Sequence, residues 1–168
     1  MARVYTKIGD VFSAKIDDNH KKYFQLVALD TTQLNSDVIR AFEKVYPISA
    51  EPELSEIVNE KVDFYSHCAT KLGIKMGLWE KIGNTTQTGD VSNILFRGTN
   101  DYGSKVGEEP ITVSNEWYVW RINDKHFTNI GKLEGENRKA YIGMVINPLG
   151  IIELLKGNKY PVNYPDFE

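Results

Sequence analysis

The fold is decided by residues 9–29, GDVFSAKIDDNHKKYFQLVAL. Apolar and polar side chains alternate over 12–16, which is typical of a strand with one buried face. Residues 17–20 have turn chemistry, because Asp and Asn tolerate tight turns. A second apolar run follows over 23–29, so the stretch predicts an antiparallel hairpin.

Apolar runs further along the chain predict more strands. The run over 117–122, WYVWRI, has the strongest β composition of the sequence. Shorter runs predict strands over 62–68, 94–97 and 127–131, and residues 140–147 read as one buried strand.

Residues 35–47 are open to two interpretations. Asn35 or Ser36 is a suitable helix cap, Pro47 ends the segment, and the apolar residues between them fall on one helical face. This pattern favours a short helix. The alternative is a strand, because residues 38–42, VIRAF, also tolerate the β conformation.

A short helix is predicted after Asn147, because Pro148 is favoured at the first helical position. Its apolar side would be formed by Leu149, Ile152 and Leu155, and residues 157–158 would end it.

Together these elements predict the α+β class. We expect a mostly antiparallel, partly barrel-like (SH3-like) sheet with one or two short helices. The length of 168 residues predicts a single globular domain over residues 1–168.

Composition narrows the classes of function. A net charge of -3 argues against a dedicated nucleic-acid binder, which usually carries a basic excess. The single cysteine, Cys68, allows no intramolecular disulfide and fits a reducing compartment. No apolar run approaches the ~20 residues that cross a bilayer, and no apolar segment follows the basic residue near Met1. We therefore expect a cytoplasmic protein without a membrane partner.

Motifs for catalysis are missing from the sequence. The histidines, His20, His67 and His126, have no metal-ligand spacing, and the chain has neither a nucleophile elbow nor a phosphate loop. His67 and Cys68 are neighbours on a predicted strand, so they point to opposite faces. We expect no metal, no cofactor and no catalytic residue, with Cys68 as a core thiol.

The candidate binding residues lie in two segments. One covers residues 97–103 at the end of the strand over 94–97, and the other covers Glu116 and the start of the strand over 117–122. Each has a structural alternative: the first would form a turn in which Arg97 pairs with a carboxylate, and the aromatics of the second would pack in the core. The predicted partner-binding residues are Arg97, Asp101, Tyr102, Glu116, Trp117 and Trp120.

Several short motifs resemble those of known bacterial proteins. KIGDVF at 7–12, followed by YFQ at 23–25, resembles the start of the immunity-protein 26 family of bacterial polymorphic toxin systems, over roughly residues 7–30. LWEK at 78–81, NDYG at 100–103 and WYVW at 117–120 look like motifs of uncharacterised bacterial proteins with the same opening. GDVF also resembles the first strand of small SH3-like barrels, including ribonuclease toxins of the MazF and PemK type.

The resemblance implies a non-catalytic, mostly β protein that binds and neutralises a bacterial toxin domain, often a nuclease. Such a protein would expose a patch of aromatic and acidic residues. One alternative is a nucleic-acid-processing enzyme on an SH3-like barrel, in which Arg97, His67 or His126 would converge with a carboxylate in a pocket. Another is a small-molecule sensor whose cavity is lined by Trp79, Trp117 and Trp120.

Overall fold

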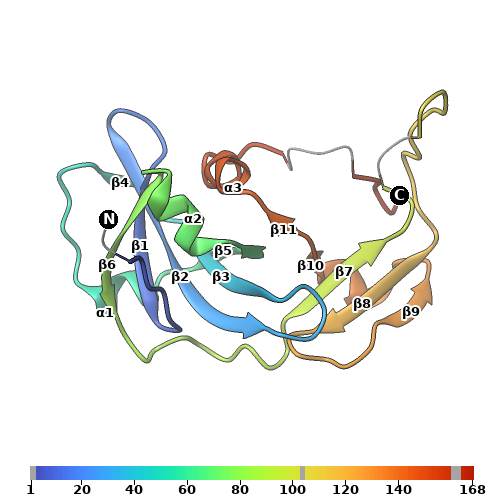
Figure 1. Cartoon of the computed structure of the whole chain (residues 1–168), viewed down its shortest axis with the longest axis horizontal. Coiled ribbons are helices and arrows are strands. Elements are labelled where there is room, and N and C mark those ends of the chain that lie inside the picture. The colour runs from blue at the N-terminus through green and yellow to red at the C-terminus, as the bar shows by residue number, and fades with distance from the viewer. Residues whose placement is uncertain (1–2, 103–104, 160–163) are drawn as a thin grey trace.

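The computed structural model describes residues 3–102, 105–159 and 164–168. Its strands form a larger and a smaller sheet that lie side by side, with α3 above the region between them (Figure 1). The elements are β1 (Asp10–Lys15), β2 (His20–Asp30), β3 (Ser36–Phe42), β4 (Tyr46–Pro47), α1 (Leu54–Val58), β5 (Val62–Cys68), α2 (Thr70–Lys75), β6 (Trp79–Asn84), β7 (Leu95–Thr99), β8 (Trp117–Arg121), β9 (Thr128–Gly131), the 3-10 helix η1 (Gly135–Lys139), β10 (Tyr141–Ile142), β11 (Val145–Ile146) and α3 (Pro148–Leu155).

Most strand pairs are antiparallel, as expected. The larger sheet has the order β11-β5-β3-β2-β1-β6, with β4 paired to β2, and the smaller sheet has the order β10-β7-β8-β9. Among these named strands, β11–β5 and β10–β7 pair in parallel. Both parallel strands come from the segment that connects η1 to α3.

The N-terminal hairpin is confirmed. β1 and β2 pair antiparallel, and Phe12 lies opposite Phe24. The turn between them is closed by Asp17, whose Oδ1 accepts the backbone N–H of His20 at 2.8 Å. The strands together with the short helices confirm the α+β class, and this hairpin supplies two strands of the larger sheet.

The SH3-like barrel is not confirmed. β11 and β6 are the two edges of the larger sheet, so the described strands leave that sheet open. The number of helices is also corrected, because the described residues contain three α-helices and η1 rather than one or two. The sequence does not predict α2 as a stable helix, because Gly73 lowers helix propensity. The glycine is required there because a Cβ would lie 1.9 Å from the Trp79 ring.

The helix favoured over residues 35–47 is wrong, and the strand alternative is correct. β3 is a central strand between β2 and β5. Val38 and Ile39 are adjacent and both fully buried, because opposite faces of the sheet are covered. Tertiary packing on both faces therefore outweighs the helical spacing of the apolar residues.

Different elements cover the two faces of the larger sheet. Phe12, Phe24, Leu26 and Ile39 pack on one face against Ile151 and Leu155 of α3. On the other face, Phe42 packs against α1, and Val27 and Val38 contact Phe96 and Trp120 of the smaller sheet. The smaller sheet has its own outer cluster, which contains Trp117 and Leu133.

The single strand expected over residues 140–147 is wrong, because the segment divides between the two sheets. β10 pairs with β7, and β11 pairs with β5. The chain crosses between them at Gly143, whose N–H donates to the carbonyl of Arg97 at 2.8 Å. A Cβ on Gly143 would lie 2.0 Å from a ring carbon of Trp120, so only glycine fits at this crossing.

The helix after Asn147 is confirmed as α3, with one difference on its apolar side. Asn147 Oδ1 accepts the N–H of Gly150 at 2.8 Å and caps the helix. Ile152 and Leu155 are buried as predicted, but Ile151 is buried in place of Leu149, which is exposed. The helix packs on the sheet at a rotation that puts Ile151 inward.

We predict that Gly143→Ala lowers the free energy of unfolding by about 1–3 kcal/mol, the usual cost of overpacking a core. The measurement is denaturant unfolding in a double-mutant cycle with Trp120→Phe. The smaller ring should relieve the clash, so the double variant should be more stable than the sum of the single effects predicts. Additive effects would contradict the steric explanation.

Candidate functional site

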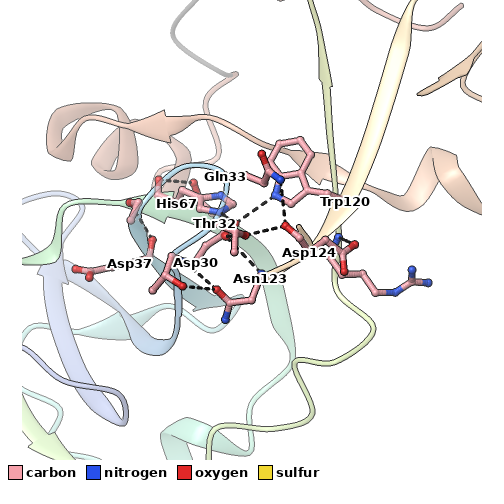
Figure 2. Close-up of polar contacts among 12 residues, drawn as sticks. Asp30, Thr32, Gln33, Asp37, His67, Trp120, Asn123 and Asp124 are labelled. Atoms are coloured by element: carbon pink, nitrogen blue, oxygen red, sulfur yellow. Dashed lines mark hydrogen bonds and ion pairs between the residues drawn. The ribbon is translucent and has the colours of Figure 1, made fainter. Parts of the chain in front are cut away.

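A buried polar cluster lies where the two sheets meet. It contains Asp30 at the end of β2, His67 on β5 and Trp120 on β8 (Figure 2). His67 Nε2 lies 2.9 Å from Asp30 Oδ2, and Trp120 Nε1 donates to the same oxygen at 3.2 Å. Asp30 and His67 are fully buried. The carboxylate of Asp30 therefore accepts hydrogen bonds from both sheets at a position that is closed to solvent.

Short segments beside Asp30 strengthen the same junction. The second oxygen of Asp30 accepts from Thr32 Oγ1 at 3.3 Å and from the N–H of Asn123 at 3.4 Å. Thr32 and Gln33 also donate to the carbonyl of Asp124, at 2.8 and 3.0 Å (Figure 2). The loop after β2 is thus fastened to the turn after β8.

The electrostatics of the cluster favour a charged Asp30 and a neutral His67. Burial raises the pKa of Asp30, but the hydrogen bonds from His67 and Trp120 outweigh it and leave that pKa below 3.8. Burial lowers the pKa of His67 below 6.5, and the interaction with Asp30 offsets only part of this. Because Nδ1 of His67 has no partner among the described residues, the proton lies on Nε2 and is donated to Asp30.

This arrangement serves to join the sheets. The His67 ring also packs on Phe96 of the smaller sheet, with ring centroids 4.3 Å apart. No reacting group reaches a fully buried dyad unless the junction opens, so the cluster is structural in the folded chain. Removing one partner of such a buried pair typically costs about 3–5 kcal/mol.

We predict that the protein loses stability with acid in two stages. Both folded-state pKa values are lowered, so the stabilisation is complete above pH 6.5 and is lost as pH falls. His67 acts first, below 6.5, and Asp30 follows below 3.8, each with a slope of up to about 1.4 kcal/mol per pH unit. Denaturant unfolding at a series of pH values measures this profile.

His67→Gln is the informative variant, because its amide still donates to Asp30 but does not titrate. It should flatten the profile between pH 6.5, where His67 begins to act, and pH 3.8, where Asp30 follows. His126→Gln is the matched control, since His126 is exposed and the same substitution there leaves the Asp30–His67 pair in place. A flat profile for the unmodified chain over that interval would contradict the assignment.

A second feature is an open hollow beside β5, which we name the β5 cleft. Its volume is about 420 Å³, and it lies between the two sheets and the end of α3. Its lining comes from residues 63–66 of β5, Arg97 of β7, residues 140–142 around β10, Ile146, Leu154 and residues 157–158.

The cleft is lined by two charged residues, Asp63 and Arg97. Asp63 forms an ion pair with Lys22, whereas no carboxylate of the described residues is in ion-pair contact with Arg97. One guanidinium nitrogen donates to the carbonyl of Ala140 at 2.7 Å, and Nε is buried without a partner there. The guanidinium lies 5.5 Å from the centre of the Trp117 ring and 5.2 Å from that of Phe167. Burial lowers the pKa of Arg97, although Tyr164 and Asp166 offset part of this effect.

The structure separates the other predicted binding residues by exposure. Trp117 and Trp120 are each 1% exposed, and they lie in different core clusters. Tyr102 is 50% exposed, and Glu116 is also exposed. Of the aromatic residues in the predicted set, Tyr102 is therefore the one at the surface.

Asp101 stabilises the base of the loop between β7 and β8. Its Oδ2 accepts from Ser114 Oγ at 2.7 Å, and that hydroxyl lies 2.8 Å from Thr99 Oγ1. Thr99 also donates to the carbonyl of Glu116 at 3.0 Å. The base of the loop is thus held closed by side chains from both ends.

Beyond this base, the loop exposes apolar side chains that the sequence analysis did not single out. Val106 is fully exposed, and Ile111 and Val113 are more than 40% exposed. Figure 1 shows the yellow segment between β7 and β8 extending away from both sheets. The sequence contained a signal for this surface, namely apolar residues inside an otherwise polar loop, because exposed apolar patches often mark interaction sites. We name residues 102, 106, 108, 109, 111 and 113 the loop patch.

The residues required by the alternative functions do not gather in one place. His67 is enclosed with Asp30, whereas His126 is exposed. Trp79, Trp117 and Trp120 lie in three different clusters and do not line one cavity. Cys68 is buried as predicted, and burial raises the pKa of its thiol. Within residues 3–102, 105–159 and 164–168, no three His, Cys, Asp or Glu side chains are grouped to hold a metal.

Comparison of the chain with protein-family models, curated proteins and solved structures finds no match. In the described part of the chain, no helix has the length and apolar character needed to cross a membrane.

Proposed function

We propose that this chain is a non-catalytic protein-binding module of the immunity type, which binds and neutralises a bacterial toxin domain. The observation that carries the proposal is the loop patch. Exposed apolar side chains of Tyr102, Val106 and Ile111 share a protruding loop with carboxylates. Apolar anchors surrounded by charged residues are the usual composition of a protein interface.

The charge of the loop indicates a basic partner. Residues 100–116 carry four carboxylates and one lysine, a net charge of -3 that equals the net charge of the whole chain. Toxin domains that act on nucleic acid carry a basic surface for the phosphate backbone. Complementary charge increases the rate at which two such surfaces meet.

The direct test is co-expression in a bacterial host with each secreted toxin domain encoded in the same genome. Restored growth and a stoichiometric complex in size-exclusion chromatography would support the proposal. Failure to bind or neutralise any of these domains would contradict it.

We predict that Glu108→Lys with Glu109→Lys slows association with the toxin domain roughly tenfold or more at low salt. Glu51→Lys with Glu80→Lys is the matched control. Both pairs change the net charge from -3 to +1, since each substitution adds two charges, and all four residues are exposed. Surface plasmon resonance measures the rates. Equal slowing by both pairs would assign the effect to net charge and not to the loop.

A further inference from the structure

The edge of β5 that faces the β5 cleft is only partly paired. β3 pairs with β5 along its length on one side, whereas β11 on the other side pairs only with His67 and Cys68. No described strand is hydrogen-bonded to residues 63–66 on that side, although β10, which pairs with β7, passes close to β5. This part of the edge is unpaired because residues 141–143 bond to the smaller sheet before the chain reaches β5 as β11.

An unpaired strand edge offers alternating N–H and carbonyl groups to another extended chain. Residues 63–66 are consecutive, and all four line the cleft. Because neighbouring residues of a strand point to opposite faces, the cleft lies along the edge of β5 and not over one face of the sheet. Four residues of a strand span roughly 13 Å. The volume of about 420 Å³ lies within the range of ligand sites, about 300–1,000 Å³.

The walls of the cleft suit the alternating side chains of an extended peptide. Tyr65 and Tyr141 meet on one side, with ring centroids 5.3 Å apart. Phe64, Ile146 and Leu154 supply apolar surface. In strand addition, backbone hydrogen bonds provide affinity and such side-chain contacts provide specificity.

The charges of the cleft favour a carboxylate. Asp63 is already neutralised by Lys22, with 3.1 Å between Nζ and Oδ2. Arg97 has no carboxylate in ion-pair contact among the described residues, although Asp166 is near enough to act on its charge, and its one side-chain hydrogen bond goes to a neutral carbonyl. A partly buried cation gains most from a charged acceptor, because hydrogen bonds between ions are roughly twice as strong as neutral ones.

We propose that the β5 cleft binds an extended peptide segment of a partner protein, which pairs with the edge at residues 63–66 and brings a carboxylate to Arg97. The carboxylate belongs to an acidic side chain or to a free C-terminus. This site is separate from the loop patch and does not depend on it. It gives the chain a second protein-binding surface that recognises backbone and negative charge.

The experiment presents the full chain with a displayed library of random heptapeptides that have free C-termini. Enriched peptides are synthesised, and their dissociation constants are measured by fluorescence polarisation. We expect alternating apolar residues and one essential carboxylate. C-terminal amidation and Asp/Glu→Asn/Gln replacement in the peptide distinguish the two sources of that carboxylate, and the essential one should weaken binding at least about tenfold when removed.

Two variants of the protein locate the site. Asn158→Trp places a large ring at the exposed rim of the cleft, and Arg97→Met removes the charge. Each should weaken the peptide at least about tenfold. Asn129→Trp on the exposed surface of β9 is the matched control and should leave binding unchanged. N-methylation of single peptide amides should reduce binding at alternate positions, because only alternate N–H groups face β5.

Three outcomes would overturn the proposal: no enriched peptide, binding that Asn158→Trp leaves intact, or N-methylation without an alternating effect. If the peptides no longer bind the variant with Glu108→Lys and Glu109→Lys but still bind Asn158→Trp, the binding site is the loop patch instead. Failure of the toxin test leaves the cleft experiment unaffected, so the two proposals fail separately.

Discussion

The Asp30 carboxylate is the interaction on which the arrangement of the two sheets depends. A buried charge is tolerated only where donors surround it, and the donors to Asp30 come from β5, from β8 and from the turn after β8. The sheets therefore cannot slide relative to one another without leaving that charge unsatisfied. The position of Trp120 follows from this junction, and the Trp120 ring in turn requires glycine at 143. The crossing at Gly143 is what leaves the edge of β5 open.

A buried arginine, Arg40, and a partly buried one, Arg97, show how similar groups take different roles. Arg40 on β3 is held by acceptors on several sides, including Gln25 Oε1 at 3.0 Å and the carbonyl of Gln87 at 2.8 Å. It fastens the segment between β6 and β7 over the larger sheet, which is a structural task. Arg97 has a single carbonyl acceptor and lines a cleft. This difference in unused hydrogen-bonding capacity is why the inference about a ligand rests on Arg97.

The two proposed binding surfaces use different physical means. The loop patch presents side chains on a protruding segment, so it suits a folded partner with a basic surface. The β5 cleft presents backbone groups along a strand edge, so it suits a segment that becomes extended when it binds. Asp101, Ser114 and Thr99 brace the base of the loop, and the Asp30 cluster holds the walls of the cleft in place. Rigid supports of this kind reduce the entropy lost on binding.

Features that depend on near neighbours could be predicted from the residues alone. The hairpin of β1 and β2, the strand β8, the capped start of α3 and the buried Cys68 all follow from alternation, turn chemistry or one residue's preference. Tertiary structure decided the rest. β3 is a strand because sheets and helices cover both of its faces, and residues 140–147 divide because β10 pairs with β7 of the smaller sheet whereas β11 pairs with β5 of the larger sheet. His67 likewise meets Asp30 across 37 positions of sequence, and Arg97 reaches a cleft built from β5 and α3. Such contacts join residues that local patterns do not relate, because only packing of the complete chain brings them together.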